Sequence, residues 1–250
     1  MSSTRTDRNS ASEFVRLLAS KLKKTPLHPQ WFIYHREEKL LSTLCDNLCG
    51  LVLDIGCADA KPRNHLGADA CYIGLDYYST ATNWYHTRPD VFADAQALPF
   101  FSNSINHCLL LDVLEHIPDP DRCLSSIHET LKPGGTLTIM VPLMYPIHDA
   151  PLDFHRWTRF GLAQAARKHG FHITQTEAIG HPLETAALNA NIALSKTVLN
   201  WLGGKNPLAL LGLLLPVAVF SVNSLAWLFG KLSRADDFMP YAYRTVWTKE

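Results

Sequence analysis

The sequence predicts an α/β fold in which a doubly wound, mostly parallel sheet has helices on both faces. Short apolar runs of strand length recur from residue 51 onward. Segments of helical periodicity separate these runs along the chain. The runs also lack the polar alternation of a half-exposed strand, and this is typical of a parallel sheet that is buried on both faces.

The predicted elements follow one another from residue 31 to the end of the chain. Residues 31–48 repeat apolar side chains at helical intervals and predict a helix that Gly50 ends. Pro133-Gly134-Gly135 predicts a turn between a helix and a strand. The strands are expected at LVLDI, CYIGLD, INHCLLLD, TLTIMVP, 172–178 and 242–248, and further helices at 123–131 and 158–169. In such folds the ligand lies at the carboxyl ends of the strands.

Length and composition indicate one compact domain with an extension, because the chain has 250 residues of which 47% are hydrophobic. Lys plus Arg and Asp plus Glu each number 23, so no overall charge indicates a nucleic-acid partner. The six cysteines form no CxxC pair, and no signal-peptide pattern is recognised near Met1. We therefore expect a reduced, cytoplasmic setting.

Three segments are expected along the chain. Residues 1–50 form N-terminal helices, residues 51–180 and 241–250 form a ligand-binding domain, and residues 181–240 form an apolar helical insertion before the last strand. Within the first segment, residues 13–24 predict a short basic amphipathic helix. Such a helix packs on the domain or lies on an anionic membrane surface.

The turn after the first predicted strand has the composition of a nucleotide-binding turn. Gly56 permits a tight turn and a close approach of the backbone to a ligand. Asp76 ends the second strand about twenty residues later, where an acid accepts hydrogen bonds from the hydroxyls of an adenosine ribose. Nicotinamide-dependent oxidoreductases share this spacing, so the two motifs alone leave that enzyme class open.

Later motifs separate these alternatives. The runs LDIGCADA, GLDY, ADAQALPF, LLLDVLEHIPDP and LKPGGTLTIMVP occur in order between Leu51 and Phe171. Together they resemble the class I S-adenosylmethionine-dependent methyltransferases, type 11-like. This resemblance implies a Rossmann-like fold with a mostly parallel seven-stranded sheet, and S-adenosylmethionine as cofactor. The resemblance implies cofactor contacts from Asp54, Gly56, Cys57 and Ala58 on the methionine side, Asp76 and Tyr77 at the ribose, Asp94 and Ala95 at the adenine, and Asp112 after the fourth strand.

The turn departs from the family pattern at two positions. Ala58 and Ala60 stand where glycines are common, and alanine in a backbone with positive φ costs roughly 1 kcal/mol. A catalytically inactive relative that serves as a membrane adaptor is therefore an alternative. Glu115 and His116 are interpreted mainly as residues that shape the loop after the fourth strand.

The segment Tyr145–Thr158 is the candidate acceptor site, because it follows the strand at 136–142 and is dense in ionisable and aromatic side chains. We predict catalytic roles for His148 and His155 as bases, and for Asp153 or Asp149 as the group that fixes a tautomer. Arg156 binds an anionic group of the substrate or pairs with Asp153 to hold the loop. No metal site is expected, because the spacing of His148 and His155 fits no familiar zinc pattern.

The insertion suggests a membrane surface or a protein partner. Residues 208–229 carry no charge and are long enough to span a bilayer, although Pro216 and Asn223 interrupt the apolar run. A single crossing would place the last strand on the opposite side of the membrane, so we expect peripheral contact through residues 183–232 at the inner face of the membrane. A homodimer interface or a lid is the alternative.

The acceptor is less defined than the cofactor. A small molecule and a lipid-linked acceptor, such as a cell-envelope glycan, remain open, and the segment at 146–158 resembles that of a bacterial subset of methyltransferases associated with cell-envelope functions. No nucleic-acid partner is expected, because the chain has no basic stripe or nucleic-acid motif.

Overall fold

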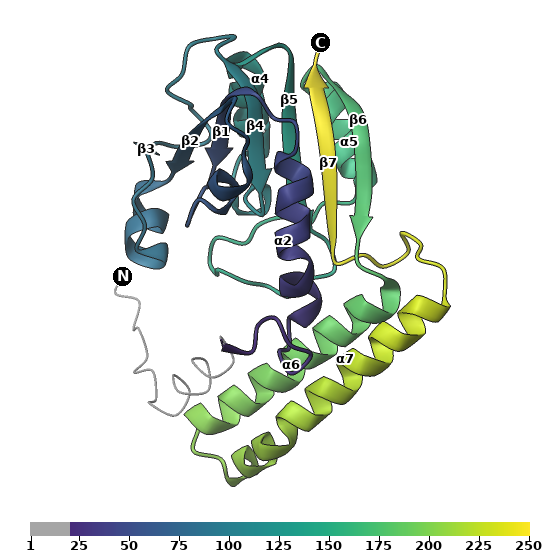
Figure 1. Ribbon diagram of the computed structural model, residues 1–250. Coiled ribbons are helices and arrows are strands. Elements are labelled where there is room, and N and C mark those ends of the chain that lie inside the picture. Colours follow the sequence, from purple (N-terminus) through teal and green to yellow (C-terminus); the bar gives the residue numbers. More distant parts are fainter. Residues whose placement is uncertain (1–20) are drawn as a thin grey trace. The chain divides into compact units, whose positions relative to one another are not determined.

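The computed structural model of the protein describes residues 21–250 (Figure 1). The expected amphipathic helix at residues 13–24 lies mostly outside the described residues. The described chain forms two compact units. The sheet unit comprises Lys39–Ile179 and Pro240–Glu250, and the helical unit comprises residues 21–38 together with Gly180–Met239.

The sheet unit contains seven strands in the order β3-β2-β1-β4-β5-β7-β6. The strands β1 to β5 pair in parallel, and β7 is antiparallel to both of its neighbours, β5 and β6. This arrangement confirms the predicted mostly parallel, Rossmann-like sheet. The strands are β1 (Gly50–Ile55), β2 (Ala70–Asp76), β3 (Val91–Phe92), β4 (Ile105–Leu111), β5 (Leu131–Pro142), β6 (Phe171–Ile179) and β7 (Ala242–Lys249).

Successive side chains of a strand point to opposite faces of the sheet. Both faces of this sheet are apolar and are covered by helices. Val52 of β1 packs with Leu44 and Cys45 at the end of α2 (Trp31–Cys45). Its neighbour Leu53 belongs instead to the main core, to which α4 (Pro120–Thr130) and α5 (Arg159–Lys168) contribute apolar side chains. Continuous apolar strands are therefore required, as the sequence pattern indicated.

Several connections differ from the sequence prediction. The crossover from β1 to β2 contains only a 3-10 helix, η1 (Lys61–His65). After β2 come a short turn of α-helix, α3 (Tyr78–Thr80), and a π-helix, η2 (Ala81–Tyr85), neither of which was predicted. The first long helix ends at Cys45 rather than at Gly50, and the predicted turn at 133–135 is an irregular part of β5.

The helical unit contains two long helices that run side by side (Figure 1). They are α6 (Pro182–Gly203) and α7 (Leu215–Leu232), joined through a 3-10 helix, η4 (Pro207–Leu214). Inside the pair, Asn191 Nδ2 donates to Asn223 Oδ1 at 2.9 Å. Asn223 Nδ2 donates in turn to the carbonyls of Pro26 and His28 at 2.8 and 3.1 Å. The asparagines that interrupt the apolar sequence are therefore buried and hydrogen-bonded.

Candidate cofactor and acceptor site

The turn after β1 has a backbone that requires glycine at its first position. Gly56 has φ +74°, and a Cβ atom there would lie 2.5 Å from Cγ2 of Val113. The amides of Gly56 and Cys57 both donate to the carbonyl of Leu75, at 2.7 and 3.0 Å. Those hydrogen bonds hold the turn against the end of β2, as expected for a nucleotide-binding turn.

Alanine occupies the left-handed region at two further positions of this turn. Ala58 has φ 43° and Ala60 has φ 54°. The prediction that these alanines stand where the backbone favours glycine is confirmed, and each conformation costs roughly 1 kcal/mol.

Asp76 joins the turn to β2 through its buried carboxylate. Its Oδ2 accepts the amide of Ala58 at 2.9 Å, and its Oδ1 accepts the amide of Tyr77 and the hydroxyl of Thr80 at 2.7 and 2.8 Å. A carboxylate offers about four acceptor positions, so one position at Oδ2 is left for another donor. A ribose hydroxyl has the chemistry that this position requires.

Asp54 is a second buried carboxylate at the same end of the sheet. The hydroxyl of Tyr72 donates to its Oδ2 at 2.6 Å. Burial raises the pKa of Asp54 to about 6, and the neighbouring carboxylate of Asp76 also raises it. A cationic ligand nearby would favour the ionised form, and S-adenosylmethionine has both a sulfonium and an ammonium group.

The other predicted cofactor residues lie in the turns that follow these strands. The amide of Ala93 donates to the carbonyl of Asp76, so the segment with Asp94 and Ala95 continues beside β2. Asp94 accepts the amide of Gln96 at 2.8 Å, and Ala95 is buried in the main core. Asp112 follows β4 with φ 53°. The predicted residues therefore follow β1, β2, β3 and β4 at one edge of the sheet, and their contacts with the cofactor remain predictions.

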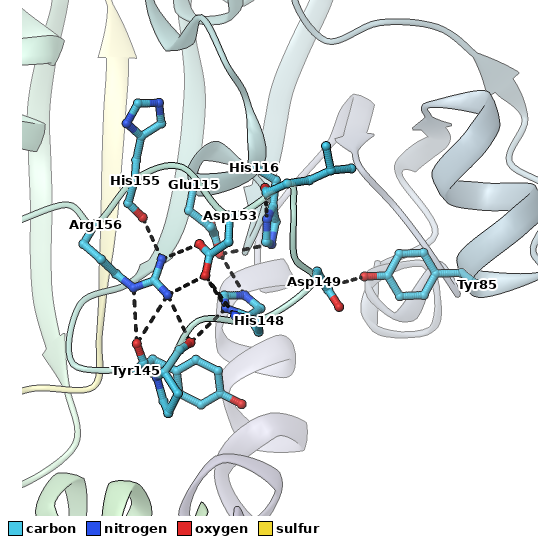
Figure 2. Close-up of polar contacts among 11 residues, drawn as sticks. Tyr85, Glu115, His116, Tyr145, His148, Asp149, Asp153, His155 and Arg156 are labelled. Carbon is cyan, nitrogen blue, oxygen red and sulfur yellow. Dashed lines mark hydrogen bonds and ion pairs between the residues drawn. The ribbon is translucent and has the colours of Figure 1, made fainter. Parts of the chain in front are cut away.

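Arg156 holds the candidate acceptor segment together. It forms a two-pronged ion pair with Asp153, in which Nη2 lies 2.7 Å from Oδ2. The same guanidinium donates to the carbonyls of Tyr145 and Pro146 (Figure 2). This pairing keeps the pKa of Asp153 well below its usual range. The predicted local Asp153–Arg156 pair is confirmed, and the guanidinium of Arg156 donates its hydrogen bonds to groups of the same loop.

The structure brings together two of the three predicted catalytic residues. The backbone amide of His148 donates to Asp153 Oδ2 at 2.9 Å, and its imidazole Nδ1 lies 3.3 Å from the same oxygen. The imidazole of His155 points away from this pair (Figure 2). Its buried Nε2 has no hydrogen-bond partner in the described part of the chain. Asp149 instead accepts the hydroxyl of Tyr85, at 3.1 Å.

Glu115 and His116 lie beside His148, whereas their sequence pattern indicated mainly a role in shaping the loop after β4. They belong to the 3-10 helix η3 (Leu114–His116) that follows β4. Glu115 is fully buried, and burial raises its pKa far above the usual range. Among residues 21–250, neither of its carboxylate oxygens has a hydrogen-bond partner. A buried acid next to Asp112 at a strand end was the sequence signal for this site.

Comparison with known proteins agrees with these motifs. Residues 53–139 match a family model described as a methyltransferase domain. An uncharacterised methyltransferase of Mycobacterium tuberculosis is 34% identical over 112 residues, which cover 40% of this chain and 42% of the relative. The ubiquinone/menaquinone biosynthesis C-methyltransferase UbiE of Escherichia coli is 30% identical over 97 residues, covering 37% of this chain and 39% of UbiE.

A solved structure extends the comparison to the fold. Phosphoethanolamine N-methyltransferase 2 of Haemonchus contortus, in complex with S-adenosylmethionine, has a TM-score of 0.51 and 17% identity. The match covers 94% of this chain and 59% of that one. The chain spans about two fifths of the length of the curated relatives it matches. The family match, the strand order and the motifs together identify residues 53–139 as a methyltransferase domain of the class I superfamily, whose cofactor is S-adenosylmethionine.

Proposed function

We propose that the protein transfers the methyl group of S-adenosylmethionine to an acceptor bound beside His148. One observation supports this proposal best: η3 contacts both the cofactor turn and the acceptor segment. Val113, directly before η3, packs against Gly56. The backbone carbonyl of Glu115, within η3, accepts the amides of Phe154 and His155 at 2.9 and 3.2 Å. Positioning of two reactants is the main task in methyl transfer.

The chemistry needs little beyond this positioning. When bound, S-adenosylmethionine supplies an activated methyl group. The acceptor atom forms a bond to the methyl carbon while the bond from that carbon to sulfur breaks, and an acceptor hydroxyl also loses its proton. Burial lowers the pKa of His148, so the imidazole is neutral near pH 7 and able to take a proton. Asp153 positions His148 through the contacts to its backbone amide and Nδ1.

We also propose that the helical unit keeps the protein at the inner face of a membrane, where a lipid-linked acceptor is concentrated. Residues Pro207–Leu232 have a mean hydropathy of 2.1, and by length and composition they could cross a membrane. Only 11% of the apolar window is buried. Between Glu184 and Asp236 the chain has four basic residues, Lys196, Lys205, Lys231 and Arg234, and no acidic ones. Lys231 lies over the ring of Trp227, a pair suited to the headgroup layer.

Peripheral contact suits the chain path better than a single crossing. Along the chain, β6 precedes the helical pair and β7 follows it. The two strands are paired with each other in one sheet. A single membrane crossing between them would separate these neighbours. A homodimer that covers the exposed apolar side chains is the second candidate for this surface, because a covered patch of this kind is typical of interfaces.

The acceptor class can be tested with radiolabelled S-adenosylmethionine. Purified protein is incubated with the labelled cofactor and with either extracted bacterial membrane lipids or the soluble metabolites of the same cells. We expect label in the lipid fraction, and none with Asp76→Ala. Label only in the soluble fraction would replace the lipid-linked acceptor with a small molecule. Binding of the cofactor without transfer to either fraction would favour the inactive adaptor.

A further inference from the structure

Three potential metal ligands from two segments meet at the end of β4. Glu115 and His116 lie in η3, and His148 lies in the acceptor segment. The Nε2 atoms of His116 and His148 each lie 3.8 Å from Oε1 of Glu115. One ligand atom from each residue lies within 4.8 Å of the other two (Figure 2). These residues are 32 or more positions apart across the two segments, so only the fold brings them together.

The hydrogen bonds of the two imidazoles orient their lone pairs toward Glu115. Nδ1 of His116 lies 2.7 Å from the carbonyl of Leu152, which only accepts hydrogen bonds. Nδ1 of His148 faces the carboxylate of Asp153 and the carbonyl of Pro146, both at 3.3 Å. Each Nδ1 therefore has the proton in a neutral ring, and each Nε2 has a free lone pair.

Three potential metal-ligand atoms therefore face one another. The side chain of Glu115 is fully buried, and within residues 21–250 neither of its oxygens has a hydrogen-bond partner. A separation of 3.8 Å is too long for a hydrogen bond to either imidazole. A buried carboxylate without a partner is costly, and a cation would neutralise it and bind the two lone pairs.

We propose that Glu115, His116 and His148 bind one divalent first-row transition-metal ion, such as Zn²⁺. Two imidazoles and one carboxylate are a donor set that suits Zn²⁺, Fe²⁺ and related ions, and it leaves coordination positions open. Ligand atoms on one such ion lie about 3 to 3.5 Å apart, since each is about 2.0 to 2.2 Å from the metal. The three atoms need to approach one another by only about 1 Å.

The surrounding contacts are those that metal-binding histidines usually have. Such histidines donate their other ring N–H to a carboxylate or a backbone carbonyl, which fixes the ring orientation. His148 has the carbonyl of Pro146 in this place, with the carboxylate of Asp153 also 3.3 Å from its Nδ1, and His116 has the carbonyl of Leu152. Arg156 holds Asp153 in turn. Asp153 and Arg156 are therefore positioning residues for the ion.

The site also narrows the acceptor chemistry, an inference that rests on the proposed methyl transfer. An ion with open positions beside the cofactor turn binds an oxygen of the acceptor and lowers the pKa of a hydroxyl group bound to it. In that case His148 acts as a metal ligand, and the ion, rather than the imidazole, promotes loss of the hydroxyl proton. The acceptor class that fits is a hydroxyl-bearing compound.

Metal binding can be measured without any acceptor. Tag-free, full-length protein is stripped with a chelator and titrated with ZnCl₂ by calorimetry, and with CoCl₂ by visible absorption, which reports the ligand geometry. We expect one ion per chain. Glu115→Gln and His148→Gln are each expected to weaken binding at least 10-fold, and Asp153→Asn about 10- to 100-fold. His172→Gln is the matched control, because this histidine is exposed on β6.

Two results would overturn the site: no stoichiometric binding of Zn²⁺ or Co²⁺ by the wild-type protein, or binding unchanged in both ligand variants. Titration of S-adenosylmethionine into the same samples shows whether each variant is folded. It also separates the two proposals. Cofactor binding without metal binding removes the ion and leaves the methyltransferase, whereas metal binding without cofactor binding does the reverse.

Discussion

The sheet unit and the helical unit distribute polar and apolar side chains in opposite ways. In the sheet unit, large apolar residues such as Trp247 and Leu53 are fully buried, and the buried acids Asp54, Asp76 and Glu115 lie at or just after the carboxyl ends of strands. In the helical unit, Asn191 and Asn223 are fully buried, while Leu213 is 80% exposed. The sheet unit therefore has apolar side chains inside and polar side chains outside, as is usual for a globular domain.

This contrast supports the proposal that the apolar insertion contacts a membrane or a second protein surface. The exposed leucines and phenylalanines of η4 and α7 form a contiguous stretch of sequence, and few of their side chains pack inside the unit. The buried asparagines join the helices to each other by hydrogen bonds, so the apolar side chains are free to face outward.

The largest effect is expected from charges on the exposed apolar surface. Leu210, Leu213 and Leu214 are all exposed in η4, and burying each in a bilayer interface contributes about 1.5 kcal/mol or more. Changing all three to Glu is expected to weaken binding to anionic lipid vesicles by roughly 1,000-fold, as measured by co-sedimentation. The control variant changes Arg167, His172 and Gln175, which are exposed in the sheet unit, to Glu.

Absence of vesicle binding by the wild-type protein would contradict the membrane proposal. In that event, light scattering would show whether the same triple substitution dissociates a dimer.

The next effect concerns the buried centre of the helical unit. Asn223→Ala removes the acceptor of Asn191 and the donor to two backbone carbonyls. We expect the free energy of unfolding to fall by about 3 kcal/mol, because the remaining polar groups lose their partners. Urea unfolding measures the change. Asn200→Ala, at an exposed position of α6, should change it by less than about 0.5 kcal/mol, and equal effects would contradict this account.

Substitution of Asp54 in the sheet unit is expected to have a smaller effect, which in this case is an increase in the free energy of unfolding. Its folded pKa of about 6 lies above the ordinary value of 3.8. The protonated form is therefore favoured by folding, and stability is lost as pH rises through about 6. Asp54→Asn should raise the free energy of unfolding by about 2 kcal/mol near pH 8 and leave it almost unchanged near pH 4. A gain that does not depend on pH would contradict this cause.

The smallest effect concerns the alanines of the cofactor turn. Ala58→Gly relieves a residue with φ 43° and should stabilise the protein by up to about 1 kcal/mol, with slightly tighter cofactor binding. Thermal unfolding with and without S-adenosylmethionine measures both changes. Ala97→Gly, at an exposed position outside the positive-φ residues, should destabilise slightly, and the same sign for both variants would disprove strain at Ala58.

The sequence predicted most of the fold, because long apolar strands and periodic helices are local patterns. The strand at LVLDI appears as Gly50–Ile55, and the helix at 158–169 begins after Thr158, whose hydroxyl accepts the amide of Gly161. Short elements were missed, since β3 has two residues and the π-helix η2 has five. Segments of this length have too few residues to show a period.

The candidate site was predicted only where its residues belong to one motif. Gly56 and Asp76 follow strands, so their meeting follows from the parallel sheet. The approach of His148 to Glu115 depends on how a loop folds back, and no spacing in the sequence indicates it. His155 illustrates the same limit, because it lies in the same segment as His148 and its side chain points elsewhere (Figure 2).

The central claim is that the edge formed by Gly56, Ala58 and Asp76 binds S-adenosylmethionine, and calorimetric titration tests it most directly. We expect one site per chain with a Kd of roughly micromolar order, weakened at least about 10-fold by Asp76→Ala. Asp59→Ala, an exposed acid in the same turn, should leave the Kd unchanged. Failure of the folded wild-type protein to bind, or equal binding by Asp76→Ala, would contradict the account.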